Sequence, residues 1–462
     1  MENTPQPSGA TFRLSEWCAN VPAQWSKAEL GSASIAFIDT IAVMLAGSSQ
    51  PAQQDFSEAV LALDGGNGKA TVAGRSLAAS VPWAAMINGC AAHQLDFDDV
   101  LDPSMSHPSA VLVPAILALA QSRANSGKDC LDAYIVGLEV LARLGEAMNL
   151  AHYSNGWHAT STLGAMAAAA ACSRLLRLDV RRTQMAISLA SSMAGGSKCQ
   201  FGTFAKPMHA GMAAKNGIIS AHLSSMGTDA IEEPLEGPWG YIALTCGSEA
   251  PGFARVLQKL GKQSAMEEHG VSIKLYPCCN STHRPIDALL AVLAQHAFAI
   301  EDIARIEVHI SEIAARNLRY SRPETPAQAR FSLEYCLAIA LRQRNGPGPA
   351  DFTPHAVLDT EVQSLLPLMD IRTDPELAMP GSAGEAPHRI HLTVHLKDGR
   401  KIDQRMEHPL GHPKNPVGQD TLRRKFDACV KDVLGEDKAD SLWRQLSALE
   451  QQQDINTLMA LL

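Results

Sequence analysis

The sequence predicts a mostly α-helical protein that carries one smaller α+β domain. Three observations lead to this fold class. Helical spacing of apolar residues fills almost all of residues 12–250, strand-like alternation appears only after residue 300, and helical patterns return after residue 410. A hydrophobic content of 46% with only 5% aromatic residues fits close-packed helices around a sizeable core.

Six long helices are expected in the first part of the chain, because each segment has apolar residues near helical spacing and most end at Gly, Ser or Asn. They span residues 29–49, 110–127, 130–149, 160–179, 181–197 and 207–227. The fourth is built almost entirely of small residues at its centre, so it should pack closely against its neighbours. Pro207 suits the first position of the sixth.

The pattern changes near residues 250–275. Residues 304–313 alternate Ile and Val with polar residues, as expected of a half-buried strand. Two alternating runs in 388–406 surround an Asp-Gly turn and predict a hairpin. Residues 326–346 between them have a helical pattern, and 374–387 form a long Pro- and Gly-rich loop.

This pattern predicts a large domain built from both ends of the chain. The helices after residue 410 are expected to return to the first domain. The predicted parts are the first section of the helical domain (1–269), an α+β lid domain (270–405) and the returning C-terminal helices (406–462).

Composition and charge disfavour several classes of function. The net charge is −9 and no basic stripe is present, which argues against nucleic-acid binding. The first residues lack a signal pattern, and no uninterrupted apolar run reaches the length of a membrane span. Ten scattered cysteines include no C-x-x-C, so reduced thiols and a cytoplasmic location are expected. The adjacent Cys278 and Cys279 are interpreted as buried packing thiols.

The acidic stretch 96–110, DFDDVLDPSMSHPSA, contains a possible metal motif. Asp98, Asp99 and Asp102 spell D-D-x-x-D, which holds Mg²⁺ in prenyl-diphosphate enzymes. No second metal motif accompanies it, aromatic residues are few, and Pro103 follows at once. These aspartates are therefore interpreted as capping and shaping a turn, and no metal is expected.

Other polar groups stand at junctions between loops and helices, where functional sites concentrate. His158 precedes the small-residue helix, and Lys206 lies near His209 at a helix start that favours an anion. A Pro-bounded loop near the domain boundary contains further basic residues, namely Lys274, His283 and Arg284. Carboxylate, imidazole and ammonium groups together suit proton removal next to a carboxylate and stabilisation of the resulting enediolate.

Five longer motifs make the chain resemble the MmgE/PrpD family of 2-methylcitrate dehydratase-like proteins. They occur in family order over roughly residues 90–340 and read HQLDFDDVLDPSMSHPSAVLVPA, GWHATSTLGAMAAAAACSRLLRLD, GTFAKPMHAGMAAKNGIISAHLSSMG, KLYPCCNSTHRPIDALL and RFSLEYCLAIAL. The resemblance implies a helical domain with an α+β lid, a homodimer, and no metal or organic cofactor. The family includes 2-methylcitrate dehydratases, cis-aconitate decarboxylases and an iminodisuccinate epimerase, all of which act on small polycarboxylates.

The resemblance also implies a set of site residues. The expected catalytic residues are Asp96, His107, His158, Lys206 and His283, and the expected substrate-binding residues are Lys274, Arg284 and Tyr320. Lys206, His158 and Lys274 are expected to bind carboxylates, while the acid and base roles fall to Asp96, His107 and His283. Val100 stands where aconitate decarboxylases carry threonine, and Tyr320 is an approximate counterpart of their lid tyrosine.

The expected function is that of a cofactor-independent lyase, a dehydratase or a decarboxylase, which moves a proton next to a carboxylate of a di- or tricarboxylate. An epimerase of an aspartate- or succinate-like dicarboxylate is the alternative, because it shares the proton-abstraction step. A non-catalytic homodimeric scaffold is a third hypothesis. No nucleic-acid or membrane partner is expected.

Overall fold

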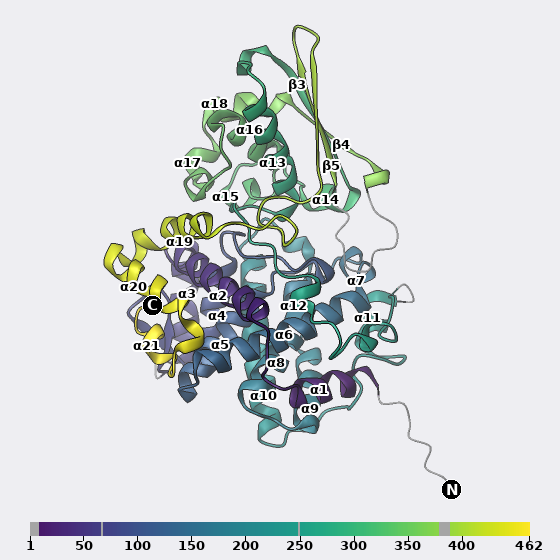
Figure 1. Ribbon diagram of the computed structural model, residues 1–462, viewed down its shortest axis with the longest axis vertical. Coiled ribbons are helices and arrows are strands. Elements are labelled where there is room, and N and C mark those ends of the chain that lie inside the picture. Colours follow the sequence, from purple (N-terminus) through teal and green to yellow (C-terminus); the bar gives the residue numbers. More distant parts are fainter. Residues whose placement is uncertain (1–8, 66–67, 248–249, 378–388) are drawn as a thin grey trace.

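The computed structural model describes residues 9–65, 68–247, 250–377 and 389–462. The chain forms a large helical body with a smaller α+β body above it (Figure 1). Each body has its own hydrophobic core. The larger core unites apolar side chains from residues 10–266 with others from residues 422–462, and the smaller core contains side chains from residues 278–396.

The centre of the helical body is formed by α4, α8 and α10, with α2 packed between α4 and the C-terminal α19. Gly89 of α4 and Gly211 of α10 let the two helices approach closely, since a Cβ added at Gly211 would lie 2.1 Å from a backbone oxygen of α4. The elements are α1 (Ala10–Asn20), α2 (Lys27–Ser48), α3 (Pro51–Asp64), β1 (Ala70–Val72), β2 (Leu77–Ala79), α4 (Val81–His93), α5 (Ser109–Arg123), α6 (Gly127–Met148), α7 (Ala151–Ser154), α8 (Ala159–Leu175), α9 (Val180–Ser192), α10 (Ala205–Ser225), α11 (Tyr241–Cys246), α12 (Ala265–Glu268), α19 (Gln419–Leu434), α20 (Glu436–Ser447) and α21 (Asn456–Met459).

The smaller body, here called the lid, is a four-stranded sheet with helices packed on it. The strand order is β4-β3-β5-β6, and only the β3–β4 pair is parallel. Alternate apolar residues of β3 and β5 share one hydrophobic core with apolar residues of α13 and α16, which explains the period-2 pattern. The elements are α13 (Asn280–Gln295), β3 (Ile303–Ile310), α14 (Glu312–Asn317), α15 (Pro326–Ala329), α16 (Leu333–Gln343), α17 (Pro354–Val357), α18 (Thr360–Leu365), β4 (Met369–Thr373), β5 (Ile390–Leu396) and β6 (Lys401–Met406).

The predicted fold class and the long helices are confirmed, and two local predictions are wrong. The expected helix 326–346 is broken between α15 and α16, because the Ser332 hydroxyl accepts a hydrogen bond from the backbone N–H of Tyr335 and starts a new helix. Pro207 is the third residue of α10, not the first. The strands β1, β2 and β4 were not expected. Residues 378–387 of the predicted loop lie outside the described residues, and the boundaries at 269 and 405 stay predictions.

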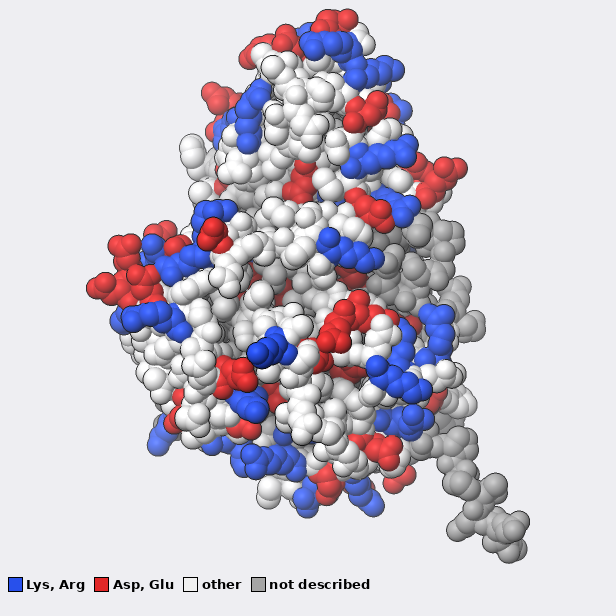
Figure 2. All heavy atoms as spheres, viewed as in Figure 1, with Lys and Arg blue, Asp and Glu red and all other residues white. Residues whose placement is uncertain are grey.

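Helix α2 is the one helix in the described part of the chain that is long and apolar enough to cross a membrane. Its surroundings are those of a core helix. It packs against α4 and α19, and its buried Asp39 forms an ion pair with Lys425 of α19, with 2.6 Å between the charged atoms. On the face shown in Figure 2, Lys and Arg side chains alternate with Asp and Glu and do not gather into one basic patch.

Candidate active site

Asp96 lies at the centre of the candidate site, in the turn that follows α4. Its φ of 51° is left-handed, a conformation that Asp tolerates better than most residues. One carboxylate oxygen accepts a hydrogen bond from Lys206 Nζ at 2.7 Å, and the other is ion-paired with Lys274. Lys274 also donates to the Asp96 backbone carbonyl at 2.8 Å. The turn, α10 and the segment before the lid therefore meet at one carboxylate.

The charge of Asp96 is fixed by these partners. Burial alone would raise its pKa, but the ammonium groups of Lys206 and Lys274 outweigh burial and hold the pKa well below its usual range. Burial would likewise lower the pKa of Lys274, and the carboxylates of Asp96 and Asp98 raise it instead. Each ammonium has three N–H donors, so Lys206 can hold Asp96 and still donate to a bound anion.

His107 is placed beside Asp96 by the start of α5. Its backbone N–H donates to Thr160 Oγ1 at 3.0 Å, which ties it to α8. Its Nδ1 lies 3.0 Å from the carbonyl oxygen of Asp99, and a carbonyl only accepts, so Nδ1 carries the proton. In the neutral ring Nε2 is then the basic nitrogen, 3.6 Å from Asp96 Oδ1.

Burial lowers the pKa of His107 well below its usual value, and the positive charge of Lys274 lowers it further. The ring is therefore neutral at physiological pH and available as a general base. His158, which caps α8, is also buried with a pKa well below the usual value, because of burial and Lys206. Its Nδ1 is hydrogen-bonded to His209 Nδ1 at 3.1 Å.

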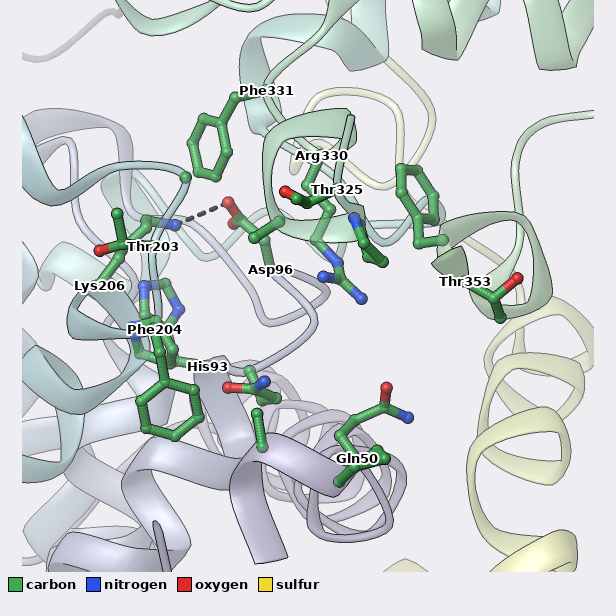
Figure 3. Close-up of a pocket in the computed structure, with 18 of the residues that line it drawn as sticks. Gln50, His93, Asp96, Thr203, Phe204, Lys206, Thr325, Arg330, Phe331 and Thr353 are labelled. Carbon is green, nitrogen blue, oxygen red and sulfur yellow. Dashed lines mark hydrogen bonds and ion pairs between the residues drawn. The ribbon is translucent and has the colours of Figure 1, made fainter. Parts of the chain in front are cut away.

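Five of the predicted site residues come together around a cavity of about 50 Å³ between the two bodies. Asp96, His107, His158 and Lys206 line it, and Lys274 reaches it through its ion pair with Asp96. A water molecule needs about 10–15 Å³ of such a cavity, so the cavity holds only a few waters. A second cavity of about 480 Å³ shares Asp96, Lys206 and Phe331 with the first (Figure 3).

The other three predicted residues do not line either cavity. The buried ring of His283 packs against Tyr276, with 5.0 Å between ring centroids. Arg284 Nε donates to the backbone carbonyl of Glu407 at 2.7 Å, and Tyr320 OH donates to the carbonyl of Phe201 at 3.0 Å. Residues that line the cavities without having been predicted include His93, Asn280, Ser281, Arg330 and Phe331.

The D-D-x-x-D aspartates each have a different partner. Asp98 accepts a hydrogen bond from His93 Nδ1 at 2.8 Å, and Asp102 lies 3.2 Å from His412 Nε2. Asp99 accepts a hydrogen bond from the Ser109 hydroxyl at 2.5 Å, while burial raises its pKa to about 8. Asp98 also lies 3.6 Å from His107 Nδ1, and Asp102 forms part of the wall of the smaller cavity, so the interpretation of these aspartates as a structural turn stays a prediction.

The two Cys residues before α13 are both buried, as predicted. Burial raises the pKa of the Cys279 thiol. For Cys278, burial alone would raise the pKa, but hydrogen bonds from Cys336 and His283 lower it to about 5. Cys278 lines neither cavity, whereas Cys279 forms part of the wall of the smaller one.

Two protein-family models match most of this chain. The MmgE/PrpD N-terminal domain matches residues 13–254, and the MmgE/PrpD C-terminal domain matches residues 276–451. The chain belongs to the MmgE/PrpD family. As a member of that family it is an MmgE/PrpD-type lyase.

Several curated relatives of this MmgE/PrpD protein bear enzyme names. Human cis-aconitate decarboxylase is 30% identical over 394 residues, which cover 82% of this chain and 79% of the human one. Cis-aconitate decarboxylase from Aspergillus terreus is 25% identical over 98% of this chain and 96% of its own. Alkylcitrate dehydratase phiI from Talaromyces stipitatus is 26% identical over 47% of this chain and 46% of its own.

The buried neutral histidines of this MmgE/PrpD protein predict acid sensitivity. Burial lowers the pKa of His152 to about 3 and holds the pKa values of His107 and His158 well below normal. In the unfolded chain, histidine side chains have a pKa of about 6.5. Below pH 6.5 the unfolded state therefore binds more protons than the folded state does. The free energy of unfolding then falls as the pH falls, by about 1.4 kcal/mol per pH unit for each additional proton that the unfolded state binds.

Urea denaturation at pH 7, 6 and 5 measures this slope. His152→Gln should reduce this slope by the contribution of one proton. The variant His222→Gln, at an exposed position of α10, should leave the slope unchanged. Equal free energies of unfolding at pH 7 and pH 5 would show that these rings are protonated in the folded protein.

Proposed function

We propose that the protein is a cofactor-independent lyase of a small tricarboxylate, with decarboxylation of cis-aconitate as its first candidate reaction. The observation that carries the proposal is the buried Asp96 carboxylate held between Lys206 and Lys274, with the neutral His107 ring beside it. Relatives that match most of this chain and are named cis-aconitate decarboxylase support the choice of substrate.

The proposed reaction consumes one proton and releases one CO₂. The bond between carbon and a carboxylate breaks, and its electron pair forms a new carbon–carbon double bond. The former double bond shifts its pair to a carbon next to a second carboxylate, where it takes up a proton, and CO₂ leaves. The unprotonated Nε2 of His107 accepts a proton from solvent and passes it to that carbon, which returns the ring to its neutral form. Lys206 stabilises the negative charge on the conjugated carboxylate.

Incubation of the purified protein with cis-aconitate and with citrate-type acids, followed by NMR in heavy water, tests the proposal. The expected result is loss of CO₂ from cis-aconitate with one solvent deuterium in the product. Loss of water from a hydroxy acid would instead identify a dehydratase. Deuterium exchange without loss of either group would identify an epimerase, and no exchange with any acid would support a scaffold.

The proposal includes no metal. Ligand atoms of His93, Asp96, Asp98 and His107 lie within 4.8 Å of one another, close enough to hold an ion. Two ammonium groups already contact the Asp96 carboxylate, however, and they would repel a divalent cation. We therefore expect turnover in the presence of EDTA to equal turnover without it.

A cytoplasmic homodimer is part of the same proposal. All ten cysteines are unpaired, which suits a reducing compartment. Between residues 223 and 244, Met226, Ile231, Trp239 and Leu244 are at least 70% exposed, and exposed apolar side chains that form a continuous patch mark interaction surfaces. If these side chains form the interface, Trp239→Glu should shift the protein from dimer to monomer in size-exclusion chromatography with light scattering, and Leu358→Glu should not.

A further inference from the structure

The cavity of about 480 Å³ has walls from both bodies of the protein. The helical body contributes Gln50, His93 and Lys206, and the lid contributes Thr325, Arg330 and Thr353. The side chains are directed into one space, where the Lys206–Asp96 ion pair forms one wall (Figure 3). The smaller cavity is also lined by this ion pair, so the two cavities adjoin, and a molecule bound in one can reach the other.

Arg330 is the charged group that the lid places in this cavity. It lies in the break between α15 and α16, and its backbone carbonyl accepts a hydrogen bond from the Cys279 N–H at 2.9 Å. The residue is only 7% exposed. In Figure 3 its guanidinium extends from the lid segment into the cavity, above Gln50.

The guanidinium of Arg330 has no ion pair or hydrogen bond with any side chain or carbonyl in the described part of the chain, and its buried Nε has no acceptor. It packs on the ring of Phe352, 5.4 Å from the ring centroid. A buried charge without a counter-ion costs free energy, so such groups are generally paired. Here the buried arginine faces a cavity, which gives the missing anion a place to bind.

The nearby Asp96 carboxylate attracts Arg330 but forms no ion pair with it. Asp96 is already contacted by two lysines, so its charge is more than neutralised before Arg330 is counted. Burial lowers the pKa of Arg330 to about 10, which still leaves the group cationic at neutral pH. The region around Asp96 thus carries excess positive charge, with Arg330 on one side of the cavity and Lys206 on the other.

We propose that Arg330 binds a carboxylate of the substrate remote from the reacting carbon and thereby selects for di- and tricarboxylates. The guanidinium has two parallel N–H donors that match a carboxylate. A second carboxylate of the same molecule binds near Lys206, so the substrate bridges the lid and the helical body. The inference rests on the proposed function and names the residue that determines its substrate class.

Isothermal titration with tricarballylate, a saturated tricarboxylate that cannot decarboxylate by this route, tests the proposal. Arg330→Gln should raise the dissociation constant roughly 10–100-fold. Arg330→Lys should raise it less, because it keeps the charge but loses the paired donors. The control Arg316→Gln, at an exposed position of α14 whose partner is Glu312, should bind as the wild type does.

A readout that separates binding from a structural role is chemical rescue. Millimolar guanidinium should restore tricarballylate binding to Arg330→Ala if the cavity holds the bound cation in place of the lost side chain. Wild-type affinity in Arg330→Gln and Arg330→Lys, or absence of tricarballylate binding to the wild type, would overturn the inference.

The two proposals fail in different ways. Arg330-dependent binding of tricarballylate without turnover of cis-aconitate would overturn the proposed reaction and leave the anion site in place. Turnover of cis-aconitate with an unchanged KM in Arg330→Gln would overturn the anion site alone.

Discussion

Replacement of His107 by Gln should lower kcat roughly 10²–10⁴-fold, the usual contribution of a positioned acid or base. The neutral ring has Nδ1–H fixed on the Asp99 carbonyl, so its Nε2 is the available base beside Asp96. Glutamine keeps a polar group of similar reach but does not exchange a proton at neutral pH. The KM should change much less than kcat, because the lysines that attract the substrate remain.

Steady-state kinetics on the substrate found by product analysis measure this effect. His152→Gln is a matched control, because His152 is a fully buried histidine that lines neither cavity and instead contacts Thr162 Oγ1 at 3.1 Å. Its kcat per folded molecule should stay near the wild-type value. If His107→Ala and Lys206→Ala both retained near-full turnover, the assignment of the site would be wrong.

Asp96→Asn should lower the free energy of unfolding by about 3–5 kcal/mol, the typical loss when one partner of a buried ion pair is removed. The neutral amide would leave the buried ammonium groups of Lys206 and Lys274 without their counter-ion. Activity should fall as well, by at least about 10²-fold, because the lysines are no longer held at the cavity wall.

Urea denaturation of Asp96→Asn, with kcat measured on the folded fraction, separates the two losses. Glu139→Gln removes one partner of another buried ion pair, with Arg143 on α6, where Nε lies 2.8 Å from the carboxylate. It should lose stability and keep its kcat. An Asp96→Asn protein as stable and as active as the wild type would show that this carboxylate has neither role.

Much of the site could be predicted because its residues stand next to readable features of the sequence. Asp96 and His107 flank the turn between two clear helices, and Lys206 begins another, so their convergence follows from the packing of α4, α5 and α10. Lys274 was also expected, since it lies where the chain passes from the helical body to the lid.

The positions of His283 and Arg330 depend on local backbone geometry that the sequence pattern does not specify. His283 shares a motif with the cavity residues Asn280 and Ser281, but α13 begins at Asn280 and its next turn directs His283 against Tyr276. Arg330 was overlooked because 326–346 has the pattern of one continuous helix. The break beside Arg330 arises from the Ser332 cap, and a capping serine is common inside apparent helices.

The central claim is that this site transfers a proton at carbon next to a carboxylate, with His107 as the proton carrier. The most direct measurement is NMR in heavy water of wild type and His107→Gln with cis-aconitate. The account predicts a decarboxylated product with one deuterium per molecule from the wild type, and at least about 10²-fold slower formation by the variant. Equal rates of deuterium uptake by the two proteins would contradict it.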